Sequence, residues 1–212
     1  MADWMIRVTP VGPLQMNSVL VTVPGPDGPA SMLIDPGEEP ERLLQIAHEA
    51  GAPVVAMVAT HGHFDHVGAA AAIQQELQLP LLCHADDLPL IHALPETMRA
   101  YGFPPAQVPR CEAVLSDDHP LVVAGQEIPV RHVPGHSPGH VMFLFPGRVV
   151  AGDCLFKGSI GRTDLPGGSF AVLEKSIRER IYTLPDETVV ICGHGPDTTV
   201  GEERTGNPFV RD

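Results

Sequence analysis

Positive charge is scarce in this sequence, and its scarcity excludes some classes of function. The 13 Lys and Arg residues face 26 Asp and Glu residues, so the net charge at pH 7 is −13. Binding to nucleic acid or to an anionic membrane needs a basic surface that displaces counterions, and the sequence has no basic stripe. We therefore expect neither nucleic acid nor a membrane as a partner. An anionic substrate would need local Arg or Lys residues.

The sequence also has no apolar run approaching the ~20 residues of a membrane span. Residues 1–7 lack the basic segment followed by an apolar one that marks a signal peptide. The four cysteines are widely spaced and form no Cys-x-x-Cys pair: Cys83, Cys111, Cys154 and Cys192. Such cysteines are more typical of small buried residues than of a disulfide framework. A cytoplasmic protein is the default expectation.

The composition is that of a folded chain, because 43% of the 212 residues are hydrophobic and only 18% are charged. Short runs rich in β-branched residues predict strands, and apolar residues at helical spacing predict helices. The predicted order is strands, helix, strand and helix, then strands, helix and strand. Two β-rich halves with helices pack naturally as an α/β/α or αββα arrangement. We expect one domain over residues 1–212.

Two segments carry expectations that depend on single residue types. Residues 94–111 contain Pro95, Pro104, Pro105 and Pro109, and we expect an irregular surface excursion there. Residues 127–133 alternate between polar and apolar side chains, which predicts one continuous strand.

One stretch, residues 60–66, organises the prediction of function. It reads Thr-His-Gly-His-Phe-Asp-His, between an apolar strand-like run and an Ala-rich helical one. Imidazole nitrogen and carboxylate oxygen are ligands of Zn²⁺ and related divalent ions. The alternative is a polar turn with solvated histidines. Such a turn would rarely alternate His-x-His and then add Asp-His directly before a helix, so we expect a metal site.

Further candidate ligands follow three other apolar strands. His136 comes after residues 127–133, Asp153 after residues 149–151, and His194 after residues 188–191. If the carboxyl ends of these strands converge with the end of residues 54–59, all the ligands meet at one edge of the sheets.

Seven nitrogen and oxygen ligands are too many for one tetrahedral ion and suit two ions about 3.5–4 Å apart. The predicted ligands of the first ion are His61, His63 and His136, those of the second are Asp65, His66 and His194, and Asp153 bridges the two. Cys154 and Cys192 lie beside ligands in the sequence. They could be soft metal ligands, but we interpret them as residues that pack in the core.

Several other polar residues have more than one interpretation. We interpret Asp35 as a turn residue. His84 could be a metal ligand, but we interpret it as part of the start of a short helix. A ligand role is disfavoured further for His48, His92 and His119. His140 either orients a ligand or is an ordinary strand residue. Lys157, Arg162 and Arg204 are the best candidates to bind an anionic substrate tail, although each is also typical of a solvated surface charge.

The sequence resembles the metallo-β-lactamase superfamily over nearly its whole length. The resemblance lies in residues 60–66, 135–140, 152–153 and 193–195. Within that family, residues 134–140 and 152–168 are similar to the branch of glyoxalase II, a hydroxyacylglutathione hydrolase. The resemblance implies an αββα four-layer sandwich. It also implies a dinuclear site, most often with Zn and sometimes with Fe or Mn.

Two departures from glyoxalase II bear on the substrate. Its C-terminal helical extension, which helps to bind glutathione, has no counterpart in the short tail after His194. Its glutathione-binding Lys and Tyr correspond to residues 161–164, where Arg162 could replace the Lys but Asp164 stands in place of the Tyr. The nearer match is to short, single-domain glyoxalase II-like hydrolases.

The resemblance and the ligand set together predict hydrolysis of a thioester such as S-lactoylglutathione, by a hydroxide that bridges two metal ions. Asp65 would aim that hydroxide while it ligates the second ion. One alternative is a persulfide dioxygenase with a single Fe; another is a hydrolase of the same fold that acts on an ester or lactone. A β-lactamase, a nuclease and a non-catalytic metal protein fit less well, and a monomer and a homodimer both remain open.

Overall fold

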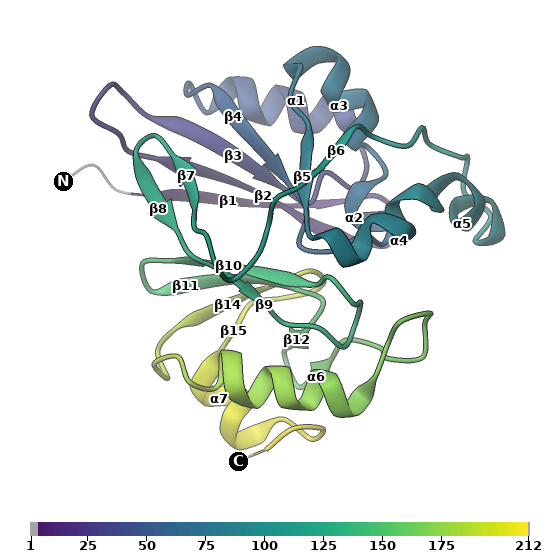
Figure 1. The fold of residues 1–212 in the computed structure, drawn as a ribbon. Coiled ribbons are helices and arrows are strands. Elements are labelled where there is room, and N and C mark those ends of the chain that lie inside the picture. The colour runs from purple at the N-terminus through teal and green to yellow at the C-terminus, as the bar shows by residue number, and fades with distance from the viewer. Residues whose placement is uncertain (1–3, 212) are drawn as a thin grey trace.

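Two β-sheets face each other, and helices cover the outer face of each sheet in the computed structural model, which describes residues 4–211 (Figure 1). The first sheet has the strand order β1 (Met5–Val11), β2 (Met16–Val23), β3 (Ala30–Ile34), β4 (Val54–Val58), β5 (Leu81–Cys83) and β6 (Cys111–Ala113). The second has the order β15 (Thr198–Thr199), β14 (Val189–Cys192), β11 (Arg148–Gly152), β10 (Val141–Phe145) and β9 (Val130–His132).

Helices and two small hairpins complete the fold. The hairpins are β7 (Leu121–Val123) with β8 (Gln126–Ile128), and β12 (Leu155–Phe156) with β13 (Ser159–Ile160). The helices are α1 (Pro40–Glu49), α2 (Phe64–Val67), α3 (Ala70–Leu77), α4 (Leu88–His92), α5 (Leu94–Ala100), α6 (Phe170–Ser176) and α7 (Val200–Gly206). A 3₁₀ turn, Ala85–Asp87, precedes α4, and a π-helical turn, Ile177–Ile181, extends α6.

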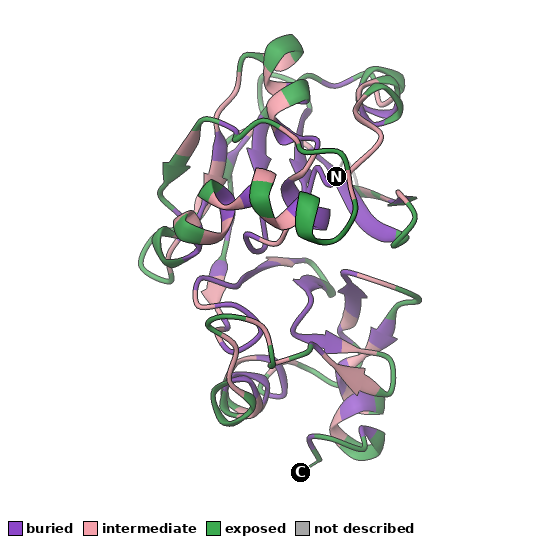
Figure 2. Cartoon of the chain, turned by 90° about the vertical axis from the view of Figure 1, so that its right-hand side faces the viewer, coloured by how far each residue is buried: buried purple, intermediate pink, exposed green. Residues whose placement is uncertain are grey.

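The central strands β2 and β3 of the first sheet are buried on both faces because each face has its own partner layer. Along β3, Leu33 packs with the helices α1 and α3, whereas Met32 and Ile34 pack toward the second sheet. Successive side chains of a strand point to opposite faces, so a continuous apolar run can fill two cores at once. The central strands are accordingly buried while the outward faces of the helices are exposed (Figure 2).

The second sheet shows the same alternation. Phe143 of β10 joins the core between the two sheets, and its neighbour Met142 joins the outer core with Leu173 of α6. Three cores therefore separate four layers, helix, sheet, sheet and helix. The predicted αββα sandwich is confirmed.

The strand directions bring several loops to one edge. Strands β3 to β6 run parallel to one another, and so do β11 and β14. The two sheets are joined at this edge by backbone hydrogen bonds: Asn17 N–H donates to the Gly193 carbonyl at 2.7 Å, and Val141 N–H donates to the Thr60 carbonyl at 2.8 Å. The loops that follow β4, β11 and β14 therefore lie close together.

Two expectations about secondary structure are wrong in part. Residues 94–100 are helical as α5, because Pro95 lies in the first turn, where a helix needs no N–H donor. Residues 103–110 are irregular, as predicted. The strand expected over residues 127–133 is broken at Pro129, which lacks an N–H; β8 pairs with β7, and β9 pairs with β10.

Within residues 4–211, no helix combines the length and the apolar character that crossing a membrane requires.

Candidate metal centre

The first four candidate ligands come from one short segment after β4. His61 and His63 lie in the turn after the strand, and Asp65 and His66 lie on α2. His61, Asp65 and His66 are buried, and His63 is half-buried. Because α2 begins directly at Phe64, its first turn carries Asp65 and His66 back toward the two preceding histidines.

The other three candidate ligands come from three separate loops of the second sheet. His136 lies between β9 and β10, Asp153 directly follows β11, and His194 follows β14 by one residue. His136 and Asp153 are buried, while the His194 side chain keeps 27% of its surface exposed. All seven predicted ligands thus lie at the edge where the two sheets meet.

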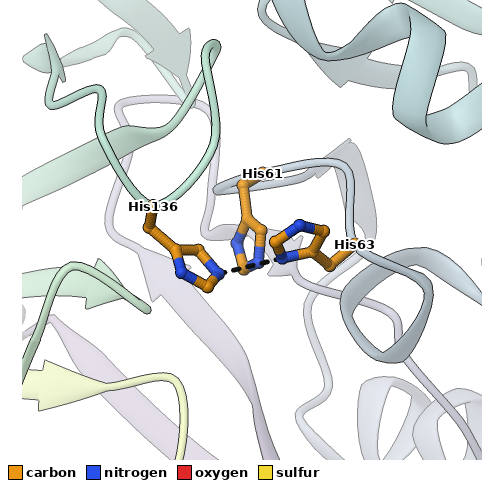
Figure 3. Close-up of side chains that lie close together, drawn as sticks. All are labelled: His61, His63 and His136. Carbon is orange, nitrogen blue, oxygen red and sulfur yellow. Dashed lines mark hydrogen bonds between the residues drawn. The ribbon is translucent and has the colours of Figure 1, made fainter. Parts of the chain in front are cut away.

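Their donor atoms form three groups of three; two of these share no residue, and the third, His61, His66 and Asp153, overlaps both of them. His61, His63 and His136 make up one group, and Asp65, His66 and His194 make up another; within each group the atoms lie within 4.8 Å of one another. In the first group His63 Nδ1 lies 2.9 Å from His136 Nε2, with His61 beside them (Figure 3). In the second, His194 Nε2 lies 3.2 Å from Asp65 Oδ2.

Asp153 lies between the two groups. Its Oδ1 is 3.3 Å from His66 Nε2 in the second group, and its Oδ2 is 3.6 Å from His136 Nε2 in the first. The same Oδ2 is 3.6 Å from His194 Nε2. This placement is the one that a bridging carboxylate would take.

The outward ring nitrogens of four histidines are held by oxygens. His66 Nδ1 donates to Asp35 Oδ2 at 2.9 Å, and His136 Nδ1 donates to the Arg162 carbonyl at 2.8 Å. His194 Nδ1 donates to the Leu14 carbonyl at 3.0 Å, and His61 Nδ1 lies 3.1 Å from Thr60 Oγ1. In the neutral form of each ring, which a metal ion requires, Nε2 then carries no proton and faces the centre, as in metal-ligating imidazoles.

Buried atoms without partners support the same assignment. His61 Nε2, His66 Nε2 and Asp153 Oδ1 are buried and have no hydrogen-bond partner among the described residues. Buried polar groups nearly always have a hydrogen-bond partner. Three unpartnered atoms that face one another therefore indicate a site for a metal ion. The donor set, imidazole nitrogen with carboxylate oxygen, suits Zn²⁺, Fe or Mn²⁺.

Burial and charge adjust the protonation of the ligands. Burial lowers the pKa of His61 well below its usual range, and it lowers the pKa of His63 to about 4, so both rings are neutral near pH 7. Burial alone would raise the pKa of Asp153, but the imidazoles of His66 and His136 outweigh it and the pKa falls. His66 behaves in the opposite way, since the carboxylates of Asp153, Asp35 and Asp65 outweigh burial and raise its pKa.

Asp35 has a larger role than that of a turn residue. It is buried, and its Oδ1 accepts the Thr60 N–H at 2.6 Å, while its Oδ2 accepts the Thr60 hydroxyl at 2.7 Å and His66 Nδ1. Through these bonds one carboxylate orients His66 directly and His61 through Thr60. Interpreting Asp35 only as a turn residue was wrong. It directly follows the buried strand β3, the same signal that pointed to the ligands.

Asp87 is a second buried carboxylate that the sequence did not single out. Its Oδ2 accepts the Gly62 N–H at 2.8 Å and the Ser137 hydroxyl at 2.7 Å, and its Oδ1 accepts the Gly139 N–H at 2.6 Å. Asp87 therefore ties the loop that carries His61 to the loop that carries His136. In the sequence it reads as an acidic residue at a helix start, so no local signal reveals this role.

The roles of His140 and the two neighbouring cysteines are settled by their contacts. His140 is buried, and its Nε2 accepts the Asp153 N–H at 3.0 Å, so of its two open interpretations the structure matches the orienting one. Cys154 Sγ donates to the Ala151 carbonyl at 2.9 Å within the outer core, and burial raises the pKa of this thiol. Burial also raises the pKa of Cys192 to about 12, so both cysteines are core thiols, as predicted.

Two glycines let the ligand loops approach closely. A Cβ at Gly193 would overlap Asp153 Oδ1, and a Cβ at Gly161 would overlap the Asp153 carbonyl oxygen. The residue-158–168 loop thereby packs against Asp153 and also supplies the Arg162 carbonyl that orients His136.

The remaining histidine candidates lie elsewhere. His84 Nδ1 accepts the Asp86 N–H at 3.2 Å and so caps the 3₁₀ turn, which agrees with its interpretation as part of a helix start. His84 also groups with Asp86 and His132, but the His84 and His132 rings are stacked at 7°. Parallel rings direct their lone pairs side by side, which is poor geometry for one ion. His48, His92 and His119 belong to none of the ligand groups found within residues 4–211.

Two cavities open onto the centre, and both are lined by His136, Asp153, Arg162 and His194. One, of about 550 Å³, extends toward α5, and the other, of about 510 Å³, extends along β12 and β13 and includes Lys157. The structure thus places Lys157 and Arg162 beside the centre.

Arg204 is not brought to the centre, contrary to expectation. It lies on α7, pairs with Asp186 and donates to the Tyr182 carbonyl at 3.2 Å, and it lines neither cavity. These contacts anchor α7 to the segment after α6.

Comparison with known proteins identifies the family of the chain. The family model of the metallo-β-lactamase superfamily matches residues 11–194. The chain is 37% identical to hydroxyacylglutathione hydrolase GloC of Haemophilus influenzae, over 97% of each chain. It is similar to the structure of TTHA1623 in a di-iron-bound form, with a TM-score of 0.85, 43% identity and coverage of 96% of this chain and 100% of that one. It is also similar to BLEG-1 B3 metallo-β-lactamase, with a TM-score of 0.87, 34% identity and coverage of 98% and 100%.

Proposed function

Since the chain belongs to the metallo-β-lactamase superfamily, a superfamily of metallo-hydrolases, we propose that it hydrolyses thioesters with the help of two divalent metal ions. The observation that carries the proposal is the pair of three-ligand groups joined by Asp153 and open to two cavities. A closed structural site would leave no room for a substrate. The name of the Haemophilus relative, a hydroxyacylglutathione hydrolase, makes a glutathione thioester such as S-lactoylglutathione the first substrate to test.

The residues of each group would hold one ion. His61, His63 and His136 would hold the first, Asp65, His66 and His194 the second, and Asp153 would contact both. Bound divalent ions would lower the pKa of water toward neutrality and polarise the thioester carbonyl. Zinc is the first expectation for both positions, and the di-iron form of TTHA1623 makes iron the next.

Asp65 is the residue proposed to direct the attacking water. Its carboxylate lines the larger cavity and lies beside His194. Burial alone would raise the pKa of Asp65, but His66 and His194 outweigh it, so the carboxylate is ionised at neutral pH and can accept a hydrogen bond. The leaving thiol has a pKa of about 8.5, so it can depart as a thiolate without a strong acid beside it.

The test combines metal analysis with three assays on the purified protein. We expect two metal ions per chain, thiol release from S-lactoylglutathione, loss of that activity on chelation, and recovery when the metal is returned. Oxygen uptake with glutathione persulfide and a single iron per chain would instead identify a dioxygenase. Hydrolysis of a chromogenic β-lactam without thiol release would instead favour a β-lactamase, the activity for which BLEG-1 B3 metallo-β-lactamase is named.

A further inference from the structure

The two cavities beside the metal centre differ in chemistry, and this difference bears on which acyl groups the protein accepts. The larger cavity has an apolar wall formed by α2, α4, α5 and the loop of residues 161–168. The side chains of that wall are Phe64, Leu90, Tyr101, Phe103 and Leu165. The smaller cavity is lined by Phe156, Ser159 and Ile160, together with Lys157.

Three aromatic rings form one continuous surface in the larger cavity. The Phe64 ring centroid lies 5.2 Å from that of Tyr101 and 5.2 Å from that of Phe103. Tyr101 leaves 51% of its surface exposed, and Leu14 at the same cavity leaves 44% exposed. Large apolar side chains that stay open to water inside a concave site are the usual lining of a pocket for an apolar ligand.

Arg162, the cation that both cavities share, is already paired. Arg162 Nε donates to Asp164 Oδ1 at 2.8 Å, and its second nitrogen donates to Asp164 Oδ2 at 2.8 Å. This bidentate geometry uses the planar fork that would otherwise grip a substrate carboxylate. Hydrogen bonding from Arg162 also lowers the pKa of Asp164 to about 2. The Asp164 carboxylate is therefore ionised at neutral pH and competes with a substrate carboxylate for Arg162.

The smaller cavity has a second cation, Lys157, which does not line the larger cavity. The Lys157 side chain is exposed, and no carboxylate pairs with its ammonium group among residues 4–211. A thioester cleaved at the centre leaves its negative charge on sulfur, so the unpaired cation favours the thiol end of the substrate. The acyl end then lies in the larger cavity, against the aromatic surface.

We propose that the protein prefers thioesters with a bulky, uncharged, apolar acyl group, which packs on Phe64, Tyr101 and Phe103 while Asp164 keeps Arg162 from binding an acyl carboxylate. This inference rests on the proposed thioesterase function and names the substrate class within it.

The experiment compares three thioesters of one thiol, glutathione, so that only the acyl end changes. They are S-phenylacetylglutathione, which is apolar, S-lactoylglutathione, which is small and polar, and S-succinylglutathione, which is anionic. We expect kcat/KM for the phenylacetyl substrate to exceed that for the lactoyl substrate by at least about tenfold, the scale of a few methylene groups in an apolar pocket. The succinyl substrate should be the slowest.

Variants locate the preference in the cavity. Replacing Tyr101 by Ala should lower the phenylacetyl-to-lactoyl ratio toward one, whereas Tyr101→Phe, which keeps the ring, should keep the ratio. Asp164→Asn frees the Arg162 fork and should raise kcat/KM for the succinyl substrate by about tenfold, the scale of one charge-assisted hydrogen bond. The matched control is Asp27→Asn, which removes the same charge from an exposed turn beyond the far end of β2 and should leave all three rates unchanged.

The outcomes separate the inference from the function beneath it. Hydrolysis of all three substrates at equal rates, or unchanged selectivity in Tyr101→Ala and Asp164→Asn, would overturn the inference and leave the thioesterase function standing. Failure of the metal-loaded protein to release thiol from any of the three would overturn both.

Discussion

The two halves of the molecule supply the metal centre in different ways. The first sheet contributes four ligands from one segment of six residues, His61 to His66, held mainly by Asp35. The second sheet contributes His136, Asp153 and His194 from three loops spread over nearly 60 residues, held by His140 and by the Arg162 and Leu14 carbonyls. The first set is arranged largely by local chain geometry, and the second by the packing of strands β9, β10, β11 and β14.

This difference predicts how many metal ligands a single substitution disturbs in each half. A change in the first half disturbs several ligands at once, because they share one turn and one supporting carboxylate. A change in the second half disturbs one ligand at a time, except at Asp153, which contacts both groups. Mutations can therefore separate the two arrangements.

The largest effect is expected for Asp153→Ala. Removing both oxygens takes away the one ligand shared by the groups, so the protein should lose metal. Thiol release should fall by at least the ~10²–10³-fold that follows removal of one transition-state-stabilising group. Metal content by mass spectrometry and the S-lactoylglutathione assay measure the two effects. Full activity with a full metal complement would rule out the bridging role; Asp27→Asn serves as a control for loss of charge alone.

Asp35→Asn should have the next largest effect, and it probes the first half. An amide cannot accept from Thr60 and His66 in the way that the carboxylate does, so His66 and, through Thr60, His61 lose their orientation. Loss of such a supporting group costs about 10–100-fold in metal affinity. Competition with a chromogenic chelator measures that affinity. Wild-type affinity at both positions would show that local chain geometry alone arranges these ligands.

Asp87→Asn tests the link between the halves. The substitution places an amide NH₂ against N–H and O–H donors from both ligand loops, which leaves buried groups unpaired. The free energy of unfolding should fall by about 1–3 kcal/mol, and activity by about tenfold. Urea unfolding followed by circular dichroism measures the first quantity. Asp86→Asn is the matched control, since the Asp86 side chain is 59% exposed and contacts neither ligand loop. Equal stability of the two variants would contradict the role given to Asp87.

The smallest effect is expected for His140, which bonds only the backbone N–H of Asp153 and stacks on the His61 ring at a centroid distance of 4.9 Å. His140→Leu leaves the buried Asp153 N–H without an acceptor and should lower metal affinity by a few-fold to about tenfold. His140→Gln keeps an acceptor and should restore most of the loss. A loss as large as that of Asp35→Asn would contradict a role limited to the backbone N–H of Asp153 and the His61 ring.

The fold and the seven candidate ligands could be predicted because they depend on local patterns. Continuous apolar runs specify which strands are buried on two faces, and a polar residue just past such a strand marks the functional edge. The same rule applied to Asp35 would have found it. It could not have found Asp87, which lies in a 3₁₀ turn between β5 and α4 and looks like any acidic helix start.

Helix α5 and the position of Arg204 were not predicted, because both depend on where a residue lies within its helix and how that helix packs. Four prolines in residues 94–111 suggested an irregular segment, but Pro95 occupies the one helical turn that tolerates it. Arg204 is one of the cations near the last ligand in sequence, yet α7 turns it toward Asp186. Proximity in sequence does not reveal which way a helix faces once it packs.

By itself, the strand pattern left an α/β/α and an αββα arrangement open, and the resemblance to the metallo-β-lactamase superfamily implied the second. The chemistry of the candidate ligands follows from side-chain type, which is a property of the chain alone. Tertiary structure decided which groups support the ligands and what lines the approach to them. Asp35 meets Thr60 across 25 residues, and Asp87 meets Gly139 across 52. The aromatic wall joins α2 to the segment after α5. Such contacts depend on how elements pack, and no short stretch of sequence contains that information.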